Sequence, residues 1–229
     1  MIGVFDSGVG GLTALGTLRA LLPTSDITFL ADRGNSPYGT KSEEELIPIV
    51  KEAIRRLHSR GADSVLIACC TASTVFNRLS DTEKKICTPI IRPTAQRAAL
   101  LTKNRRIGVI ATARTVASHA FKREIESALP DATVTEVAAQ RLVQLAEGGE
   151  CGAYASHNAI NEINSLLTPI LESGSDTLIL GCTHFPIFKE IIKDRIPNVR
   201  LVSCSEEGAR AIAEKKTEKG SGRLEFIFR

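Results

Sequence analysis

The order strand, polar turn, helix restarts midway through the chain, and this repetition constrains the fold more than any other feature. The run Arg106-Ile107-Gly108-Val109-Ile110 has the shape of Ile2-Gly3-Val4-Phe5 near the start. Further on, Leu178 to Thr183 has the shape of Leu66 to Cys69, at a similar separation. Alternating strands and helices favour mostly parallel sheets covered on both faces. The sequence therefore predicts an α/β protein of two similar halves whose sheets face each other across a cleft.

Helical spacing and turn residues indicate where the individual elements lie. Leucines from Leu12 to Leu22 recur at helical intervals before Pro23. Ser42 to Leu57 is predicted to be a helix capped by Ser42, with a boundary or kink at Pro48. Near the end, residues 206–214 are predicted to form a helix and residues 224–228 a strand. Both segments are expected to belong to the first half of the structure. We therefore predict a discontinuous first domain, 1–91 plus 206–229, and a second domain, 92–205.

Length and charge exclude several classes of protein. The chain has 229 residues, enough for one large α/β domain or two modest ones. A formal net charge of +3 is too weak to indicate nucleic-acid binding, and it fits ordinary surface charge better than a specific anionic substrate. No apolar run approaches the ~18 residues that a membrane span needs. The start lacks the pattern of a signal peptide, so we expect a cytoplasmic protein.

The cysteine spacing argues for individual roles, not for a disulfide framework. The six cysteines are at positions 69, 70, 87, 151, 182 and 204, with no C-x-x-C pair. Cys87, Cys151 and Cys204 are interpreted as small buried hydrophobic residues. A redox pair at Cys69-Cys70 is disfavoured because adjacent cysteines close a strained ring. Cys182-x-His184 lacks the four ligands of structural zinc, so no metal site is expected.

Polar side chains follow the predicted strands at the points where these strands end. They are Asp6, Asp32, Cys69, Thr112 and Cys182. Ligands of parallel sheets bind beyond the carboxyl ends of the strands. If the two halves face each other, these side chains are expected to converge on one cleft.

Two thiols from two halves suit one particular chemistry, the inversion of a carbon centre. One group must remove a proton from one face, and another must return a proton to the opposite face. Cys69 and Cys182 match this need, although a thiol of pKa ~8.5 requires help to be a thiolate at neutral pH. Each cysteine precedes a run expected to open a helix, whose positive end favours thiolate and binds carboxylates. Asp6 and His184 are placed to shuttle protons or tune the thiols.

The glycine-rich turn Asp6-Ser7-Gly8-Val9-Gly10-Gly11 leaves one alternative open. It lacks the Gly-Lys-Ser/Thr ending of a phosphate-binding loop and is not a clean dinucleotide fingerprint. Asp32 nevertheless lies ~20 residues on, as that fingerprint requires. A nucleotide-dependent protein therefore stays a minor alternative to a turn whose glycines permit tight geometry.

Five motifs, in order along nearly the whole chain, resemble those of bacterial glutamate racemases in the aspartate/glutamate racemase family. They are Gly3 to Leu12, Asp32 with Pro37 to Lys41, Ala68 to Ser73, Leu142 to Gly148 and Leu180 to Pro186. The resemblance implies cofactor-independent interconversion of L-glutamate and D-glutamate by a homodimer. It also implies supply of D-glutamate for peptidoglycan, the cell-wall polymer that sets cell shape.

The resemblance also implies roles for single residues. Cys69 and Cys182, assisted by Asp6 and His184, are the implied catalytic residues. The implied substrate-binding residues are Asp6, Ser7, Pro37, Tyr38, Gly39, Cys70, Thr71, Thr183 and His184. Cys70 departs from the family, which has an asparagine there that hydrogen-bonds the substrate. Because a thiol is a weak donor, weaker substrate binding is expected.

Two alternatives follow from the same residues. One is racemisation or isomerisation of aspartate or another small diacid, although Ser73 and His184 resemble the glutamate branch of the family. The other is a weakly active or non-catalytic amino-acid-binding homologue, which the loss of the asparagine at Cys70 motivates.

Overall fold

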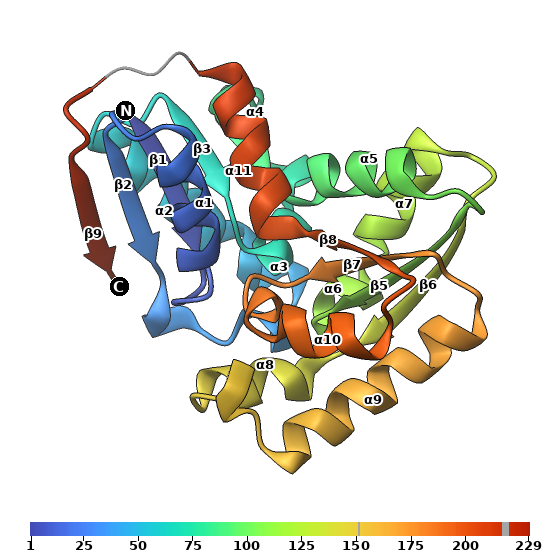
Figure 1. Cartoon of the computed structure of the whole chain (residues 1–229). Coiled ribbons are helices and arrows are strands. Elements are labelled where there is room, and N and C mark those ends of the chain that lie inside the picture. Colours follow the sequence, from blue (N-terminus) through green and yellow to red (C-terminus); the bar gives the residue numbers. More distant parts are fainter. Residues whose placement is uncertain (151, 217–219) are drawn as a thin grey trace.

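Two sheets of parallel strands organise the computed structural model, which describes residues 1–150, 152–216 and 220–229 (Figure 1). The first sheet has the order β4-β3-β1-β2-β9 and the second β6-β5-β7-β8, with every pairing parallel. The strands of the first sheet are β1 (Ile2–Asp6), β2 (Ile27–Ala31), β3 (Ser64–Ile67), β4 (Cys87–Pro89) and β9 (Leu224–Phe228). Those of the second are β5 (Arg106–Ala111), β6 (Thr133–Ala138), β7 (Thr177–Gly181) and β8 (Arg200–Ser203). The predicted α/β class with two mostly parallel sheets is confirmed.

Helices connect the strands and cover the sheets. The α-helices are α1 (Leu12–Leu21), α2 (Glu43–Ser59), α3 (Cys70–Ser73), α4 (Asp81–Ile86), α5 (Ile91–Leu101), α6 (Ala113–Ala117), α7 (Ala120–Ala128), α8 (Gln140–Glu147), α9 (His157–Glu172), α10 (Lys189–Arg195) and α11 (Cys204–Lys215). The short 3-10 helices are η1 (Arg33–Asn35), η2 (Tyr38–Thr40), η3 (Phe76–Arg78), η4 (Gly152–Tyr154) and η5 (Phe185–Phe188). None of the helices in the described ranges is both long and apolar enough to cross a membrane.

Helix α11 follows the last strand of the second sheet and packs against α1 and α5, and β9 then joins the first sheet beside β2 (Figure 1). The chain thus visits the first sheet, the second sheet and the first sheet again. The domain boundaries at 91/92 and 205/206 stay predictions.

Local sequence explains the start of α2 and its passage through Pro48. Ser42 and Glu45 form a reciprocal capping box, in which the Ser42 N–H donates to the Glu45 carboxylate at 2.7 Å. The helix then continues through Pro48, so no boundary lies there, and the kink that was the other expectation stays a prediction. Pro48 removes only the hydrogen bond to the carbonyl of Glu44, an exposed residue whose carbonyl water can reach.

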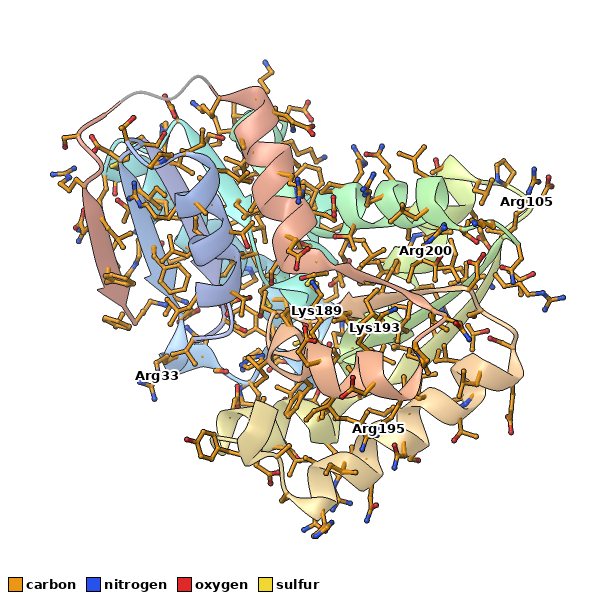
Figure 2. The ribbon with its side chains drawn as sticks, in the orientation of Figure 1. Arg33, Arg105, Lys189, Lys193, Arg195 and Arg200 are labelled. Carbon is orange, nitrogen blue, oxygen red and sulfur yellow. The ribbon has the colours of Figure 1, made fainter. Side chains whose placement is uncertain are left out.

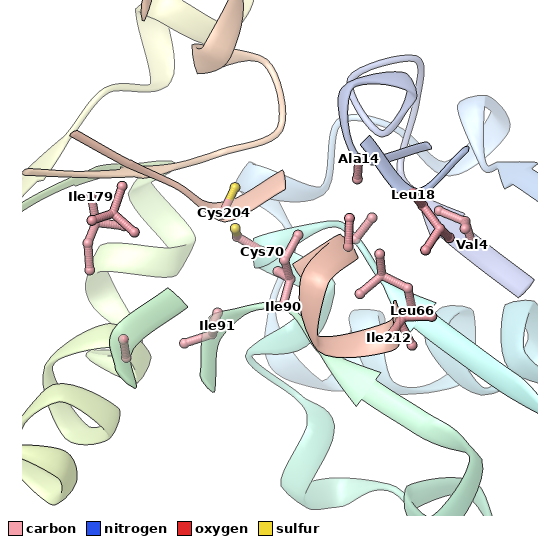
Figure 3. Packing of buried hydrophobic residues seen from close by; sticks show 14 of the residues in the cluster. Val4, Ala14, Leu18, Leu66, Cys70, Ile90, Ile91, Ile179, Cys204 and Ile212 are labelled. Atoms are coloured by element: carbon pink, nitrogen blue, oxygen red, sulfur yellow. The ribbon is translucent and has the colours of Figure 1, made fainter. Parts of the chain in front are cut away.

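The central strands are buried along their whole length, as parallel strands covered on both faces must be. Every residue of β1, β2, β3 and β7 is buried. One continuous hydrophobic cluster includes residues of both halves, among them Leu18, Leu66 and Ile179 (Figure 3). Cys87 and Cys204 are buried free thiols, in agreement with their interpretation as small hydrophobic residues. Cys151 lies outside the described residues.

Candidate active site

Strand ends from both sheets surround one cavity. Its lining consists of Ser7, Ser36, Pro37, Tyr38, Gly39, Cys69, Cys70, Thr71, Thr112, Gln140, Val143, Glu147, Cys182, Thr183 and His184. This set contains every residue singled out as catalytic or substrate-binding except Asp6. Cys69 follows β3 of the first sheet and Cys182 follows β7 of the second, so the two thiols predicted to be catalytic come from different halves.

The cavity is tight. Its volume is about 20 Å³, which holds roughly one water molecule. This cavity is therefore closed to a ligand of the size of an amino acid. A wider groove of about 770 Å³ lies between α2 and α4, but none of the predicted site residues lines it.

Asp6 lies directly behind the cavity wall and is fully buried. One carboxylate oxygen accepts from the Thr183 hydroxyl at 3.2 Å, and the other from the Gly8 N–H at 3.0 Å. Burial raises the pKa of Asp6, and the nearby His184 opposes this rise. Asp6 thus connects the glycine-rich turn of the first half to the Thr183-His184 segment of the second.

The glycines of that turn permit the close approach of the second half. A Cβ atom on Gly10 would lie 2.6 Å from the Thr183 hydroxyl and 2.9 Å from the His184 ring. A Cβ atom on Gly11 would collide with the Asp6 side chain. Both glycines therefore have a packing role beside the site, which favours the tight-turn interpretation of this motif over nucleotide binding.

Each thiol has a polar neighbour. The Cys69 thiol donates to the Ser7 hydroxyl over 3.4 Å, and Cys69 is the residue that precedes the first turn of α3. The Cys182 sulfur lies 3.5 Å from Nδ1 of His184. The helix that opens after Cys182 is the 3-10 helix η5, which begins at Phe185, so Cys182 does not adjoin a helix start as Cys69 does. The two thiols therefore have different surroundings.

Burial dominates the ionisation of both thiols. It raises the pKa of Cys69 to about 12, and the charge of Asp6 adds to this rise. Hydrogen bonds from Ser7 and Ala72 act in the opposite direction without cancelling it. Burial likewise raises the pKa of Cys182 well above its usual value, against a hydrogen bond from the His184 backbone. The expected help from helix ends is thus outweighed, and the closed site holds neutral thiols.

Buried neutral thiols predict a loss of stability in alkali. Burial raises the pKa of Cys87 to about 12, as it does for Cys69. Above pH ~9 the unfolded chain releases these protons while the folded chain keeps them, so folding weakens as pH rises toward 12. We expect the free energy of unfolding to fall by about 1.4 kcal/mol per pH unit for each such thiol. Urea unfolding at pH 8, 9 and 10 measures this slope. Cys87→Ala should remove the contribution of one thiol from the slope of the free energy of unfolding against pH. An unchanged slope would contradict the prediction.

A cluster of threonine hydroxyls joins the two halves beside the thiols. Oγ1 of Thr71 lies 2.9 Å from that of Thr112 and 3.3 Å from that of Thr115, and the last two are 2.8 Å apart. All three residues are buried. Hydroxyls can donate to the oxygens of a carboxylate, so this cluster is suited to an acidic ligand.

No lysine or arginine occurs among the described residues that line the cavity. The basic residues of α10, labelled in Figure 2, are not among the lining residues. Lys189 pairs with Glu206 at 2.7 Å, and Lys193 donates to the Pro197 carbonyl at 2.7 Å. An anionic ligand in this cavity would therefore be held by hydroxyl and backbone N–H groups instead of by cationic side chains.

Glu147 and Gln140, at the two ends of α8, line the cavity although they were not among the predicted site residues. Glu147 lies 3.6 Å from Nε2 of His184, too far for a hydrogen bond, and this nitrogen has no hydrogen-bond partner among residues 1–150, 152–216 and 220–229. The motif Leu142 to Gly148 contained a signal for Glu147. Ser36 and Val143 complete the unpredicted lining, whereas Thr112 was expected in the cleft because it follows a predicted strand.

Asp32 was expected to face the cleft, and this expectation is wrong. It is fully buried and accepts a 2.5 Å hydrogen bond from the Tyr38 hydroxyl. Arg229 donates to both of its carboxylate oxygens, at 2.9 and 2.7 Å. Asp32 therefore acts behind the site by fixing Tyr38, which lines the cavity.

Cys70 turns its thiol toward Cys204 at the start of α11 (Figure 3). Both cysteines are buried, and burial together with this contact raises the pKa of Cys70. Cys70 thus contributes a neutral thiol to the cavity wall, where an asparagine would contribute an amide.

The described residues contain no group of three or more histidine, cysteine or acidic side chains that could hold a metal ion. The fold and the cavity define a protein of two α/β halves, each with a parallel sheet, in which buried thiols from both halves share one pocket. Comparison with known proteins then specifies the family.

The family model for Asp/Glu/hydantoin racemases matches residues 18–212. The glutamate racemase of Mycobacterium leprae is 38% identical over 222 residues, which cover 95% of this chain and 79% of that protein. The solved glutamate racemase of Francisella tularensis in complex with D-glutamate superimposes with a TM-score of 0.88 at 28% identity, over 99% of this chain and 87% of that one. The solved glutamate racemase of Aquifex pyrophilus superimposes with a TM-score of 0.82 at 34% identity, over 99% of this chain and 88% of that one.

This chain therefore belongs to the Asp/Glu/hydantoin racemase family, and its resemblance to bacterial glutamate racemases is confirmed.

Proposed function

We propose that this protein is a glutamate racemase that uses Cys69 and Cys182 as the two proton-transfer groups and needs no cofactor. The observation that carries the proposal is the shared cavity, which is lined by buried Cys69 from the first half and buried Cys182 from the second. The relatives named glutamate racemase, which match nearly the whole chain, support glutamate as the substrate.

The proposed reaction removes a proton from one face of the α-carbon and adds a proton to the opposite face. One cysteine, as thiolate, takes the α-proton and becomes a thiol, leaving a carbanion. The other cysteine, as thiol, donates its proton to the opposite face and becomes a thiolate. Racemisation in the reverse direction exchanges these roles, so either thiol must be able to act as the base.

The raised pKa values of both thiols have two opposite effects on this reaction. The α-proton of an amino acid is very weakly acidic, and a base of higher pKa removes it more readily once it is ionised. The cost is that the thiolate is rare, so a neighbouring group must take the thiol proton. His184 lies 3.5 Å from the Cys182 sulfur, and Asp6 is the charged neighbour of Cys69. We propose these two residues as the proton acceptors on their respective sides.

The hydroxyl groups of the cavity are proposed to bind the two carboxylates of the substrate. Thr71 and Thr112 provide them on one side, and Ser7 and Thr183 on the other. The first half also contributes Pro37, Tyr38 and Gly39 to the lining of the cavity. The proposal also includes a cytoplasmic homodimer that supplies D-glutamate for peptidoglycan.

Exchange of the α-proton in D2O tests the proposal. Purified protein, without pyridoxal phosphate or added metal, should incorporate deuterium into L-glutamate and D-glutamate and interconvert them, and do so more slowly with aspartate. Proton NMR follows the loss of the α-signal. If the folded protein exchanges neither enantiomer of glutamate, the proposed function is wrong.

Restoring the amide at position 70 should improve the enzyme. We expect Cys70→Asn to raise kcat/KM for glutamate by about tenfold or more, because a carboxamide donates stronger hydrogen bonds than a thiol and each is worth ~1 to 3 kcal/mol in a buried site. Steady-state kinetics measures the change, and Cys70→Ala serves as the variant without any donor. A Cys70→Asn protein that folds normally and yet has an unchanged or lower kcat/KM would show that the thiol is not a handicap.

A further inference from the structure

We propose that Gln140 is a specificity-determining residue whose side-chain oxygen accepts a hydrogen bond from the α-ammonium group of the substrate. This inference rests on the proposed function, because it names one contact of the same substrate. It starts from a polar atom that the fold leaves without a partner.

Gln140 is the first residue of α8 and belongs to the second half of the chain, yet its carboxamide reaches the wall formed by the first half. A Cβ atom on Gly39 would collide with Oε1 of Gln140 and would lie 3.2 Å from Nε2. The carboxamide therefore packs against Gly39 of η2. This contact fixes the Gln140 side chain at the border between the two halves.

The Oε1 atom of Gln140 is buried and has no hydrogen-bond partner within the described parts of the chain. Buried acceptors are nearly always satisfied in folded proteins, and an unsatisfied one in the wall of a site calls for a donor from the ligand. Val143 and Glu147 lie one and two turns further along α8 and line the same cavity, so this helix presents a continuous face to the ligand.

The chemistry of glutamate specifies which of its groups can meet this oxygen. At neutral pH both carboxylates are acceptors only, and the ammonium group is the single donor. An acceptor such as Oε1 therefore pairs with the ammonium and repels the carboxylates. The Glu147 carboxylate, at the other end of α8, adds negative charge to the same wall and favours the same orientation.

A pair of ligands separates this contact from general damage to the site. Glutarate has both carboxylates of glutamate but lacks the ammonium group. Calorimetric titration of the wild-type protein and of Gln140→Ala, with glutamate and with glutarate as a competitor, gives Kd for each ligand. We expect Gln140→Ala to weaken glutamate about ten- to hundredfold, as for loss of a hydrogen bond to a charged group, and to leave glutarate unchanged.

Two further variants sharpen the test. Gln144, one turn along α8 and exposed, is the matched control, and Gln144→Ala should change neither Kd. Gln140→Glu keeps an acceptor at this point and should retain glutamate binding. An unchanged Kd for glutamate in Gln140→Ala, or an equal loss for both ligands, would overturn the inference. Deuterium exchange by the wild-type protein is measured in parallel, so that a failure of the proposed function is seen separately.

Discussion

Replacing either Cys69 or Cys182 by alanine is expected to abolish net racemisation of glutamate. Inversion needs a base on one face of the α-carbon and an acid on the other, and each variant keeps only one of them. A positioned acid or base contributes about 10² to 10⁴ in rate, so kcat should fall by at least this factor in each variant. Coupled assays of L-to-D and D-to-L conversion measure the loss.

A matched control and a second substrate make this prediction specific. Cys87→Ala is the same substitution at a buried thiol outside the cavity and should keep its activity. A glutamate analogue with a leaving group on the β-carbon needs only removal of the α-proton, after which the leaving group departs. Each single-thiol variant should therefore still support elimination from one enantiomer. Normal racemisation by Cys69→Ala or Cys182→Ala would contradict the two-thiol proposal.

Strand ends were the part of the site that the sequence could predict. Cys69, Thr112 and Cys182 follow apolar runs directly, and parallel strands bring such positions to the same edge of a sheet. The repeated pattern also placed one thiol in each half. The position of each side chain at a sheet edge depends on local periodicity and on a general rule of α/β folds, whereas their convergence on one cavity also required the assumption that the two halves face each other.

Residues supplied by docking between elements could not be predicted in the same way. Gln140 reaches Gly39 only because α8 of the second half packs over η2 of the first. Asp32 was expected in the cleft because it follows β2. Its carboxylate instead accepts hydrogen bonds from Tyr38 and Arg229 behind the cavity. Nothing in the local sequence indicates that Arg229 returns to this point.

The ionisation of the thiols depends on the balance between burial, which raises their pKa, and hydrogen bonds, which lower it. The sequence alone does not give this balance. A helix start after Cys69 could be anticipated, and its N–H groups do lower the pKa of this thiol. The extent of burial could not be anticipated, and burial has the larger effect on the pKa of both thiols. The same burial makes a site thiol a stronger base when ionised and makes neighbouring acceptors necessary for its ionisation.

Arg229→Ala is expected to destabilise the protein by about 3 kcal/mol or more. The Asp32 side chain is 0% exposed and accepts five hydrogen bonds, two from Asn35, one from Tyr38 and two from Arg229. Removal of one partner of a buried ion pair typically costs ~3 to 5 kcal/mol, because the other charge is left buried without compensation. The Arg229 side chain is 18% exposed, so water offsets part of the loss and the lower end of this range applies.

Urea unfolding of three variants separates this buried pair from ordinary surface charge. Arg55→Ala removes an ion pair to Glu52 whose arginine is 69% exposed, and it should cost no more than about 1 kcal/mol. Asp32→Asn combined with Arg229→Ala removes the uncompensated charge and should recover part of the stability lost in Arg229→Ala. If Arg229→Ala costs no more than Arg55→Ala, the pair does not stabilise the fold. Because Asp32 also holds the Tyr38 hydroxyl, the loss of stability should be accompanied by a higher KM for glutamate.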